Sequence, residues 1–272
     1  MLTTHKARGY HPITMEDLSR VPVTDQGDRS DRWQGVQHGK LVQAVADGFA
    51  EAGMPPTDIR LAVQNTGHAV VGGMVLETPP EARIEALPEM DLSVGFVSCN
   101  NSRVAMRGAI GSEVRVCGNG MCTGEFTWSR KHTNGANLQE WVREGIAQYQ
   151  NGLQEHTRRI GDLGEVEFDR PMANEALVQL ASRNAISWKN AGKVYRLWER
   201  PEFAEFGRET AFNFYQAFNS VVKELPMQDQ FRTLRNGFQV VEEVAGLYQG
   251  VTERAWDRGV HMPTFPGEDL LN

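Results

Sequence analysis

The feature that most constrains the fold is a run of short alternating segments between about residues 58 and 127. Residues 59–63 alternate apolar side chains with polar or small ones, and residues 70–76 continue in the same way after the turn sequence Asn65-Thr66-Gly67. Such alternation is typical of β-strands and hairpins. The connections are too short for the crossover helices that parallel strands need. The sequence therefore predicts an antiparallel β-meander over residues 58–127.

The later strands of this meander are predicted from the same pattern. Residues 92–97 and 104–110 would pair across a turn at Asn100-Asn101. Residues 114–117 would form a further short strand that ends in the turn Gly118-Asn119-Gly120. Pro79-Pro80 interrupts the chain between the hairpin and these strands.

Helical periodicity precedes the meander once and dominates the chain after it. Residues 39–52 place apolar side chains at helical spacing, and Gly53 would end that helix. Asn137 is the expected N-cap of an apolar stripe that begins at Leu138, and residues 161–168 predict a break. Further helices are predicted over residues 174–186, 191–198, 210–223 and 231–250.

Together these patterns predict an α+β fold: a central antiparallel β-meander followed by a mainly helical C-terminal half. We expect a single α+β domain over residues 36–257, with a sheet region over about 58–127 and a helical region over about 136–250. Residues 1–35 are polar and lack a clean period, so they are interpreted as an N-terminal arm with short helical or turn pieces. Residues 258–272 would form an irregular tail.

The bulk composition favours a cytoplasmic protein without a membrane segment. No apolar run approaches the roughly 18 residues that a membrane-spanning helix needs, and the first residues lack the apolar core of a signal peptide. The three cysteines are an odd number, which argues against a disulfide framework. We therefore expect a reducing compartment.

The charge distribution is acidic overall but includes a modestly basic segment. The formal net charge is -7, which does not suggest a protein that coats duplex DNA through bulk charge. Between residues 103 and 131, however, five basic residues face two acidic ones, Glu113 and Glu125, for a local balance of +3. This predicted basic strip consists of Arg103, Arg107, Arg115, Arg130 and Lys131.

The string Val-Arg-Val-Cys-Gly-Asn-Gly-Met-Cys at residues 114–122 is the most distinctive local motif. Its glycines allow positive φ or the close approach of a phosphate. Asn119 and, further along, His132 could then join the basic strip in contacting a polyanion, or the motif could be a tight turn among solvated charges. Cys117 and Cys122 do not have the spacing of a zinc knuckle, so we expect no metal site.

No catalytic signature stands out. The chain has no phosphate-binding glycine loop followed by Lys-Ser/Thr, no nucleophile elbow and no His-Glu-x-x-His. Glu125 is the one acid near the motif that we would test for metal-assisted chemistry. We expect no cofactor and favour a role other than catalysis.

A second string, Thr-Ala-Phe-Asn-Phe-Tyr-Gln-Ala-Phe-Asn-Ser-Val at residues 210–221, has the aromatic spacing of a buried helix. Asn219 on that helix could anchor a neighbouring turn or face a ligand. Taken together, the motif at residues 114–122, the Arg-Lys-His-Thr that follows it and this helix resemble a phage/plasmid-like protein family of unknown function. The resemblance covers about residues 61–251.

The resemblance implies a setting rather than an activity. Members of that family lie in phage, prophage and plasmid genomes, which implies a part in mobile-element DNA metabolism inside a bacterial host cell. By analogy with phage annealing proteins, which assemble small β-β-β-α cores into rings or filaments, we expect a homo-oligomer that binds or anneals single-stranded DNA in recombination or replication. The basic strip, Asn119 and His132 would contact the strand, and Trp128 would stack on bases.

Two other functions stay open. The chain could be an interaction protein that counteracts a host defence factor, with a host or phage protein as its partner. It could also be a metal-dependent nucleic-acid hydrolase built around Asn119, Glu125 and His132.

Overall fold

The computed structural model describes residues 9–23, 35–84, 87, 90–100, 105–114, 119–121, 126–132, 137–202, 209–225 and 227–247. Several predictions from the sequence lie outside these ranges and stay untested. They concern Arg103, Arg115, Cys117, Cys122, Glu125 and the tail at residues 258–272.

The predicted β-meander is confirmed as one antiparallel sheet. Within the described ranges its strands follow the order β1-β2-β3-β4-β5-β6, and β7 pairs with β5 beyond the short β6. The bounds are β1 (Tyr10–Pro12), β2 (Pro56–Gln64), β3 (Ala69–Leu76), β4 (Met90–Cys99), β5 (Met106–Val114), β6 (Asn119–Met121) and β7 (Thr127–Arg130). Gly67, at φ 73°, closes the predicted β2–β3 hairpin.

The separation of residues 104–110 from residues 114–117 is wrong, because a single strand, β5, runs without a break to Val114. Its ladder with β4 continues from Val97 opposite Arg107 to Met90 opposite Val114. Pairing along the full length of β4 thus outweighs the weak local signal of Gly111-Ser112. Asn119 also differs from its prediction, because it begins β6 and pairs with Val114 instead of sitting in a turn.

The helices lie close to the predicted segments. Their bounds are α1 (Met15–Arg20), α2 (His38–Glu51), α3 (Leu138–Glu165), α4 (Arg170–Ser182), α5 (Trp188–Glu199), α6 (Ala211–Val222) and α7 (Met227–Val244), with a 3-10 turn at Pro80–Ala82. Asn137 caps α3 as predicted by accepting hydrogen bonds from the backbone N–H groups of Gln139 and Glu140. Among the described helices none is long and apolar enough to cross a membrane.

The predicted break at residues 161–168 is wrong in its first part, because α3 continues to Glu165. Ile160 and Leu163 are fully buried at helical spacing, so tertiary packing carries the helix past Gly161. After α3, Glu167 and Thr210 form an isolated antiparallel β-bridge.

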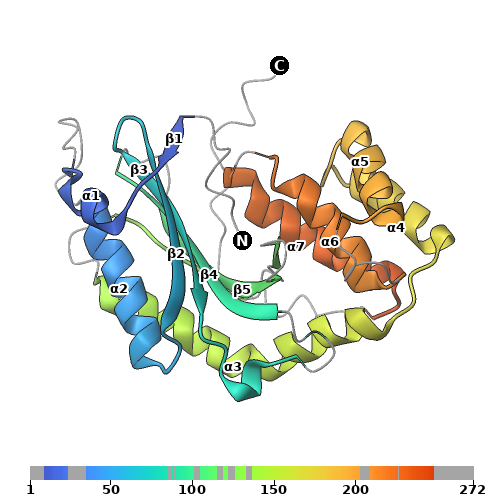
Figure 1. The fold of residues 1–272 in the computed structure, drawn as a ribbon, viewed down its shortest axis with the longest axis horizontal. Coiled ribbons are helices and arrows are strands. Elements are labelled where there is room, and N and C mark those ends of the chain that lie inside the picture. The colour runs from blue at the N-terminus through green and yellow to red at the C-terminus, as the bar shows by residue number, and fades with distance from the viewer. Residues whose placement is uncertain are drawn as a thin grey trace.

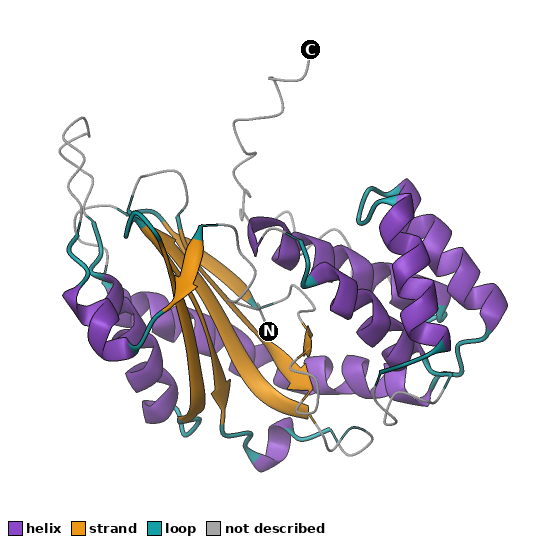
Figure 2. Ribbon diagram, turned by 45° about the horizontal axis from the view of Figure 1, so that its top comes forward, coloured by secondary structure: helices purple, strands orange, loops and turns teal. Residues whose placement is uncertain are grey.

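Two hydrophobic clusters are joined by α3, whose first half packs in one and whose second half packs in the other (Figure 1). The first cluster lies between one face of the sheet and α1, α2 and the start of α3. The second gathers α4 to α7 around the end of α3. Figure 2 shows the curved sheet between these two groups of helices. The part of the N-terminal arm that is described joins the first group, because β1 pairs with β2 and Leu18 of α1 is fully buried.

Candidate functional site

Trp128, which is predicted to stack on bases, lies in the hydrophobic core. Its side chain faces α3, where its indole packs 5.3 Å from that of Trp141, centroid to centroid. Only 6% of Trp128 is exposed. Its ring is therefore not presented to a nucleic-acid base in this structure.

Arg130 lies on the same face of the sheet and is neutralised by α3. Its guanidinium nitrogens lie 2.9 Å from Glu140 Oε2 and 3.2 Å from Glu144 Oε1. It also donates a hydrogen bond to the backbone carbonyl of Asn137 at 3.2 Å. These contacts connect β7 to the first turns of α3, and the charge of Arg130 is neutralised by two glutamates of the same fold.

Arg107, Lys131 and His132, the other predicted contact residues described with side chains, do not converge. Met106 is the partner of Arg130 across the ladder, so Arg107 projects from the opposite face of the sheet. Arg107 is half-buried, and burial lowers its pKa. Lys131 is exposed, whereas His132 is buried, with Nε2 at 3.4 Å from Ser98 Oγ. The predicted contact residues are thus divided between two faces of the sheet and the interior.

The two motifs that carry the family resemblance lie side by side. The backbone of β6, which contains Asn119, contacts α6 although some 90 residues separate them in sequence. α6 is buried along almost its whole length, amide side chains included: Asn213, Gln216 and Asn219 are each at most 5% exposed. The expectation that the aromatic helix belongs to the core is confirmed, and its polar groups belong to that core as well.

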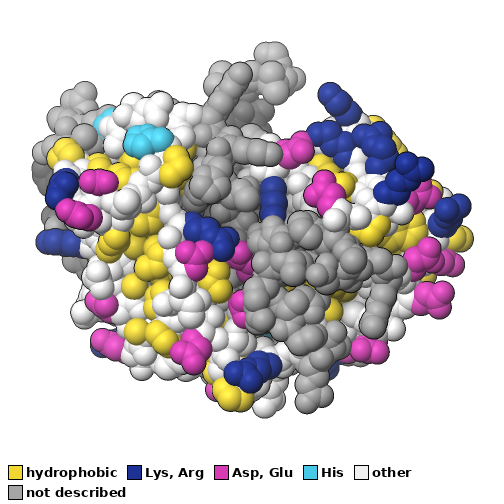
Figure 3. Space-filling model, viewed as in Figure 1, with side chains coloured by type: hydrophobic (Ala, Val, Ile, Leu, Met, Phe, Trp, Pro, Cys, Tyr) yellow, Lys and Arg dark blue, Asp and Glu magenta, His cyan; other side chains and the backbone are white. Residues whose placement is uncertain are grey.

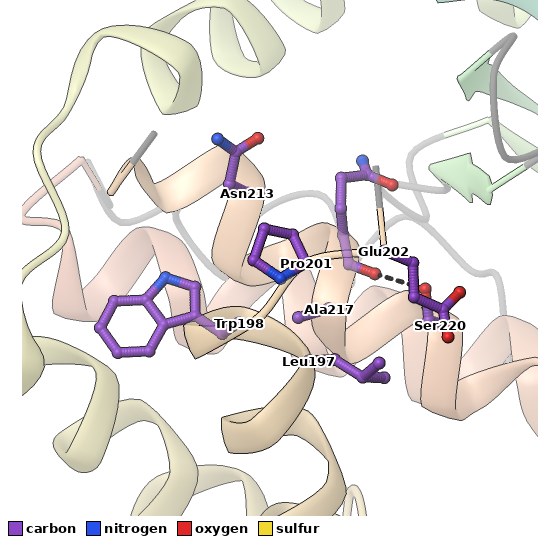
Figure 4. A pocket seen from close by; sticks show the side chains of 8 residues that line it. Leu197, Trp198, Pro201, Glu202, Asn213, Ala217 and Ser220 are labelled. Carbon is purple, nitrogen blue, oxygen red and sulfur yellow. Dashed lines mark hydrogen bonds between the residues drawn. The ribbon is translucent and has the colours of Figure 1, made fainter. Parts of the chain in front are cut away.

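A shallow hollow opens where the end of α5 meets α6 (Figure 4). Leu197 and Trp198 of α5, Pro201 beyond its end, and Asn213 and Ser220 of α6 line it. Its cavity volume of about 20 Å³ holds one or two water molecules but no nucleotide or cofactor. The hollow is therefore not a small-molecule site in this conformation.

A cationic surface lies on α5, a helix on which the sequence predicts no site residue. Lys189, Lys193 and Arg196 fall within about 60° of its circumference at 3.6 residues per turn, and Arg200 follows as the C-cap of the helix. The opposite side of the helix buries Ala191, Val194 and Trp198. Figure 3 shows the basic side chains gathered over α5. We call these four residues the α5 basic face.

Most of the charge on the α5 basic face is not neutralised by the rest of the described chain. Lys193 pairs with Glu224 at 2.5 Å. Lys189, Arg196 and Arg200 make no ion pair with any residue whose position the structure describes. Three of the four cations are thus available to a partner.

Trp188 stands beside this face at the start of α5. Its side chain is 65% exposed, the most of any large hydrophobic residue in the described ranges. Ser187 caps the helix by accepting a hydrogen bond from the backbone N–H of Asn190 at 3.3 Å, which fixes Trp188 as its first residue. An exposed indole next to unpaired cations is a combination that the packing of the fold does not explain.

A sequence signal for this surface exists. The basic residues recur at positions 189, 193, 196 and 200, directly after a Ser-Trp pair that suits a helix start. The spacing alone is equally typical of an ordinary solvated helix face. Only exposure and the absence of described ion pairs at three positions separate the two interpretations.

Comparison with protein-family models, curated proteins and solved structures finds no match for the chain. The resemblance to the phage/plasmid-like family therefore stays a prediction. Among the described residues, no group of three or more His, Cys, Asp or Glu side chains could hold a metal ion.

Proposed function

We propose that this protein binds nucleic acid through the α5 basic face and Trp188. The observation that carries the proposal is the pairing of a 65% exposed indole with cations that have no described counter-ion. Arg and Lys side chains supply most of the affinity for phosphates, and exposed aromatic rings add contacts to bases or sugars. The proposal keeps the DNA-metabolism role expected from the family resemblance and moves its site from the sheet to α5.

The overall acidity of the chain is compatible with this proposal. A local cationic surface attracts a polyanion over about 10 Å at 0.1 M salt, while charges elsewhere on the molecule are screened. The acidic remainder of the chain would limit non-specific contacts. Binding should therefore depend on a few named residues.

An acidic protein could also bind this surface. The alternative of an interaction protein that counteracts a host defence factor would therefore use the same residues. The hydrolase alternative has less support, since His132 is buried against Ser98. Single-stranded DNA binding and annealing, with a homo-oligomer, stays part of the proposal as one form of nucleic-acid binding.

The test is fluorescence anisotropy with labelled single-stranded and duplex oligonucleotides, using the full chain and three charge-matched triple variants. The first variant removes the α5 charges (Lys189→Gln, Lys193→Gln, Arg196→Gln). The second removes exposed or undescribed members of the predicted strip (Arg103→Gln, Arg115→Gln, Lys131→Gln). The third is a control on α1, α2 and the start of α3 (Arg20→Gln, Lys40→Gln, Arg143→Gln).

We expect the α5 variant to bind at least about tenfold more weakly, because each phosphate contact contributes to a steep salt-dependent term. The control variant should stay within about twofold of the unaltered chain. Equal losses of affinity in the α5 and control variants would show that only the net charge of the protein matters. Loss confined to the strip variant would return the site to residues 103–131. No binding of either oligonucleotide at low salt would overturn the proposed function.

A further inference from the structure

We infer that α5 binds double-stranded DNA by entering its major groove, with Gly192 as the point of closest approach. The inference rests on the proposed function and names the form of its ligand. It is carried by three observations: the shape of the α5 surface, the position of Gly192 and the connection between α4 and α5.

The α5 basic face is convex. Its buried side packs on α4 and α6, and its charged side points outward at the edge of the molecule (Figures 1 and 3). Proteins that bind single strands usually hold them in a basic groove, and the one hollow described beside α5 is too small for a base. A helix with side chains is about 10–12 Å across, which matches a major groove about 12 Å wide.

Gly192 is exposed at one edge of the α5 basic face, and no side chain of the fold packs against its Cα. A Cβ atom added there would meet nothing within 4 Å. Its φ is not in the left-handed region, so alanine would fit the helix and favour it by up to about 1 kcal/mol. Glycine at this position therefore weakens the helix without any compensating contact inside the chain.

Gly192 has a larger side chain on each side of it along the exposed surface of α5. At 100° per residue, Gly192 projects between Trp188, one turn before it, and Arg196, one turn after it. A phosphate or base edge that entered between these two side chains could reach the helix backbone. Glycine is the residue that permits such an approach of another molecule.

The connection that precedes α5 suits presentation of its first turn. α4 and α5 are joined by residues 183–187, with Asn184 at φ 55°. In helix-turn-helix proteins the second helix of such a pair enters the major groove, and its first residues contact base edges. Trp188 and Lys189 occupy that place in α5, while Arg196 and Arg200 lie further along, where phosphates would be reached.

The test compares a B-form DNA duplex, a single strand of the same length and an RNA duplex of matching sequence, each with the full chain. An RNA duplex is the control because its deep, narrow major groove does not admit a helix. We expect the DNA duplex to bind about tenfold more tightly than either alternative.

Gly192→Ala tests the close approach at Gly192 itself. It should raise the melting temperature of the protein and lower its affinity for duplex DNA on the order of tenfold. Gly161→Ala in α3 is the matched control, since its Cβ would meet only Ile84 at an ordinary 3.6 Å; its duplex affinity should not change. Equal or tighter binding of the single strand, or unchanged duplex affinity in Gly192→Ala, would overturn the groove-docking inference and leave the proposed function intact. Failure to bind any of the three ligands would overturn both.

Discussion

The indole of Trp128 lies directly against the backbone of Gly145: a methyl group added at Gly145 would be 2.4 Å from indole Cε2. Gly108 of β5 lies against the ring in the same way, since a methyl group added there would be 2.3 Å from indole Cζ2. Two glycines, one on the sheet and one on α3, thus form the slot that holds the ring. This packing fixes α3 against the sheet and keeps Trp128 from any external ligand.

Gly145→Ala should destabilise the fold by about 1 to 3 kcal/mol, the usual cost of adding a methyl group to a filled core. The indole cannot retreat from the new methyl because Gly108 bounds its position. Urea unfolding followed by far-UV circular dichroism measures the change. Gly161→Ala on the same helix should be neutral or slightly stabilising, and equal losses in the two variants would contradict the slot.

Arg159 of α3 and Glu242 of α7 form a buried ion pair across the second hydrophobic cluster. Their side chains are 11% and 3% exposed, and Arg159 Nε lies 2.7 Å from Glu242 Oε1. Glu242→Gln should cost about 3 kcal/mol, because it removes a buried carboxylate charge from a mostly buried guanidinium. Chemical denaturation of both single variants and the double variant measures the coupling. Additive single losses would show that the pair contributes no interaction of its own.

His156 should make the fold sensitive to acid. Burial lowers the pKa of His156 to about 4; its Nε2 lies 3.3 Å from Ser112 Oγ, and the rings of Phe126 and Tyr149 pack against it. In the unfolded chain its pKa is near 6.5, so unfolding takes up a proton below that pH. Stability linked to His156 is therefore present above about pH 6.5 and is lost as pH falls toward 4, by about 3 kcal/mol in all.

The check on His156 is the pH dependence of the free energy of unfolding, compared between the unaltered chain and His156→Gln. Glutamine can keep a hydrogen bond to Ser112 but does not titrate. We expect the difference between the two proteins to shrink steadily from pH 7 to pH 4.5. A difference that stays constant over this range would show that His156 is not a buried neutral group.

Trp188→Ala separates function from stability. Because the indole is 65% exposed, its removal should change the free energy of unfolding by no more than about 0.5 kcal/mol. The same change should weaken DNA binding about fivefold or more, as expected for an aromatic contact residue. Trp198→Phe, in the buried side of the same helix, should show the reverse pattern. Unchanged affinity in Trp188→Ala would exclude the indole from the site.

The architecture could be predicted from the sequence where local and tertiary signals agree. The meander follows from alternation and short turns. The predicted cap Asn137 is the N-cap of α3, and Thr210, the first residue of a predicted helix, is the N-cap of α6. Predictions failed where pairing or packing dominates a weak local signal. Gly161 did not end α3, and Gly111 did not interrupt β5.

The candidate site was harder to predict, because it depends on which face each side chain takes. Arg107 and Arg130 are both basic and close in the sheet, yet the register puts them on opposite faces. A four-residue strand such as β7 does not indicate in advance that Trp128 faces the core. To recognise the α5 basic face, one must know which side chains are exposed and which cations form ion pairs. Residue spacing gives neither.

The most direct test of the α5 basic face is the slope of log affinity against log salt for duplex DNA. Each phosphate contact contributes about 0.9 to that slope. Relative to the unaltered chain, the Lys189→Gln, Lys193→Gln, Arg196→Gln variant should therefore lose roughly 2 to 3 units of slope. The control variant with Arg20→Gln, Lys40→Gln and Arg143→Gln should keep the original slope. Identical slopes for the unaltered chain and the α5 variant would show that these cations do not contact phosphates and would contradict the account.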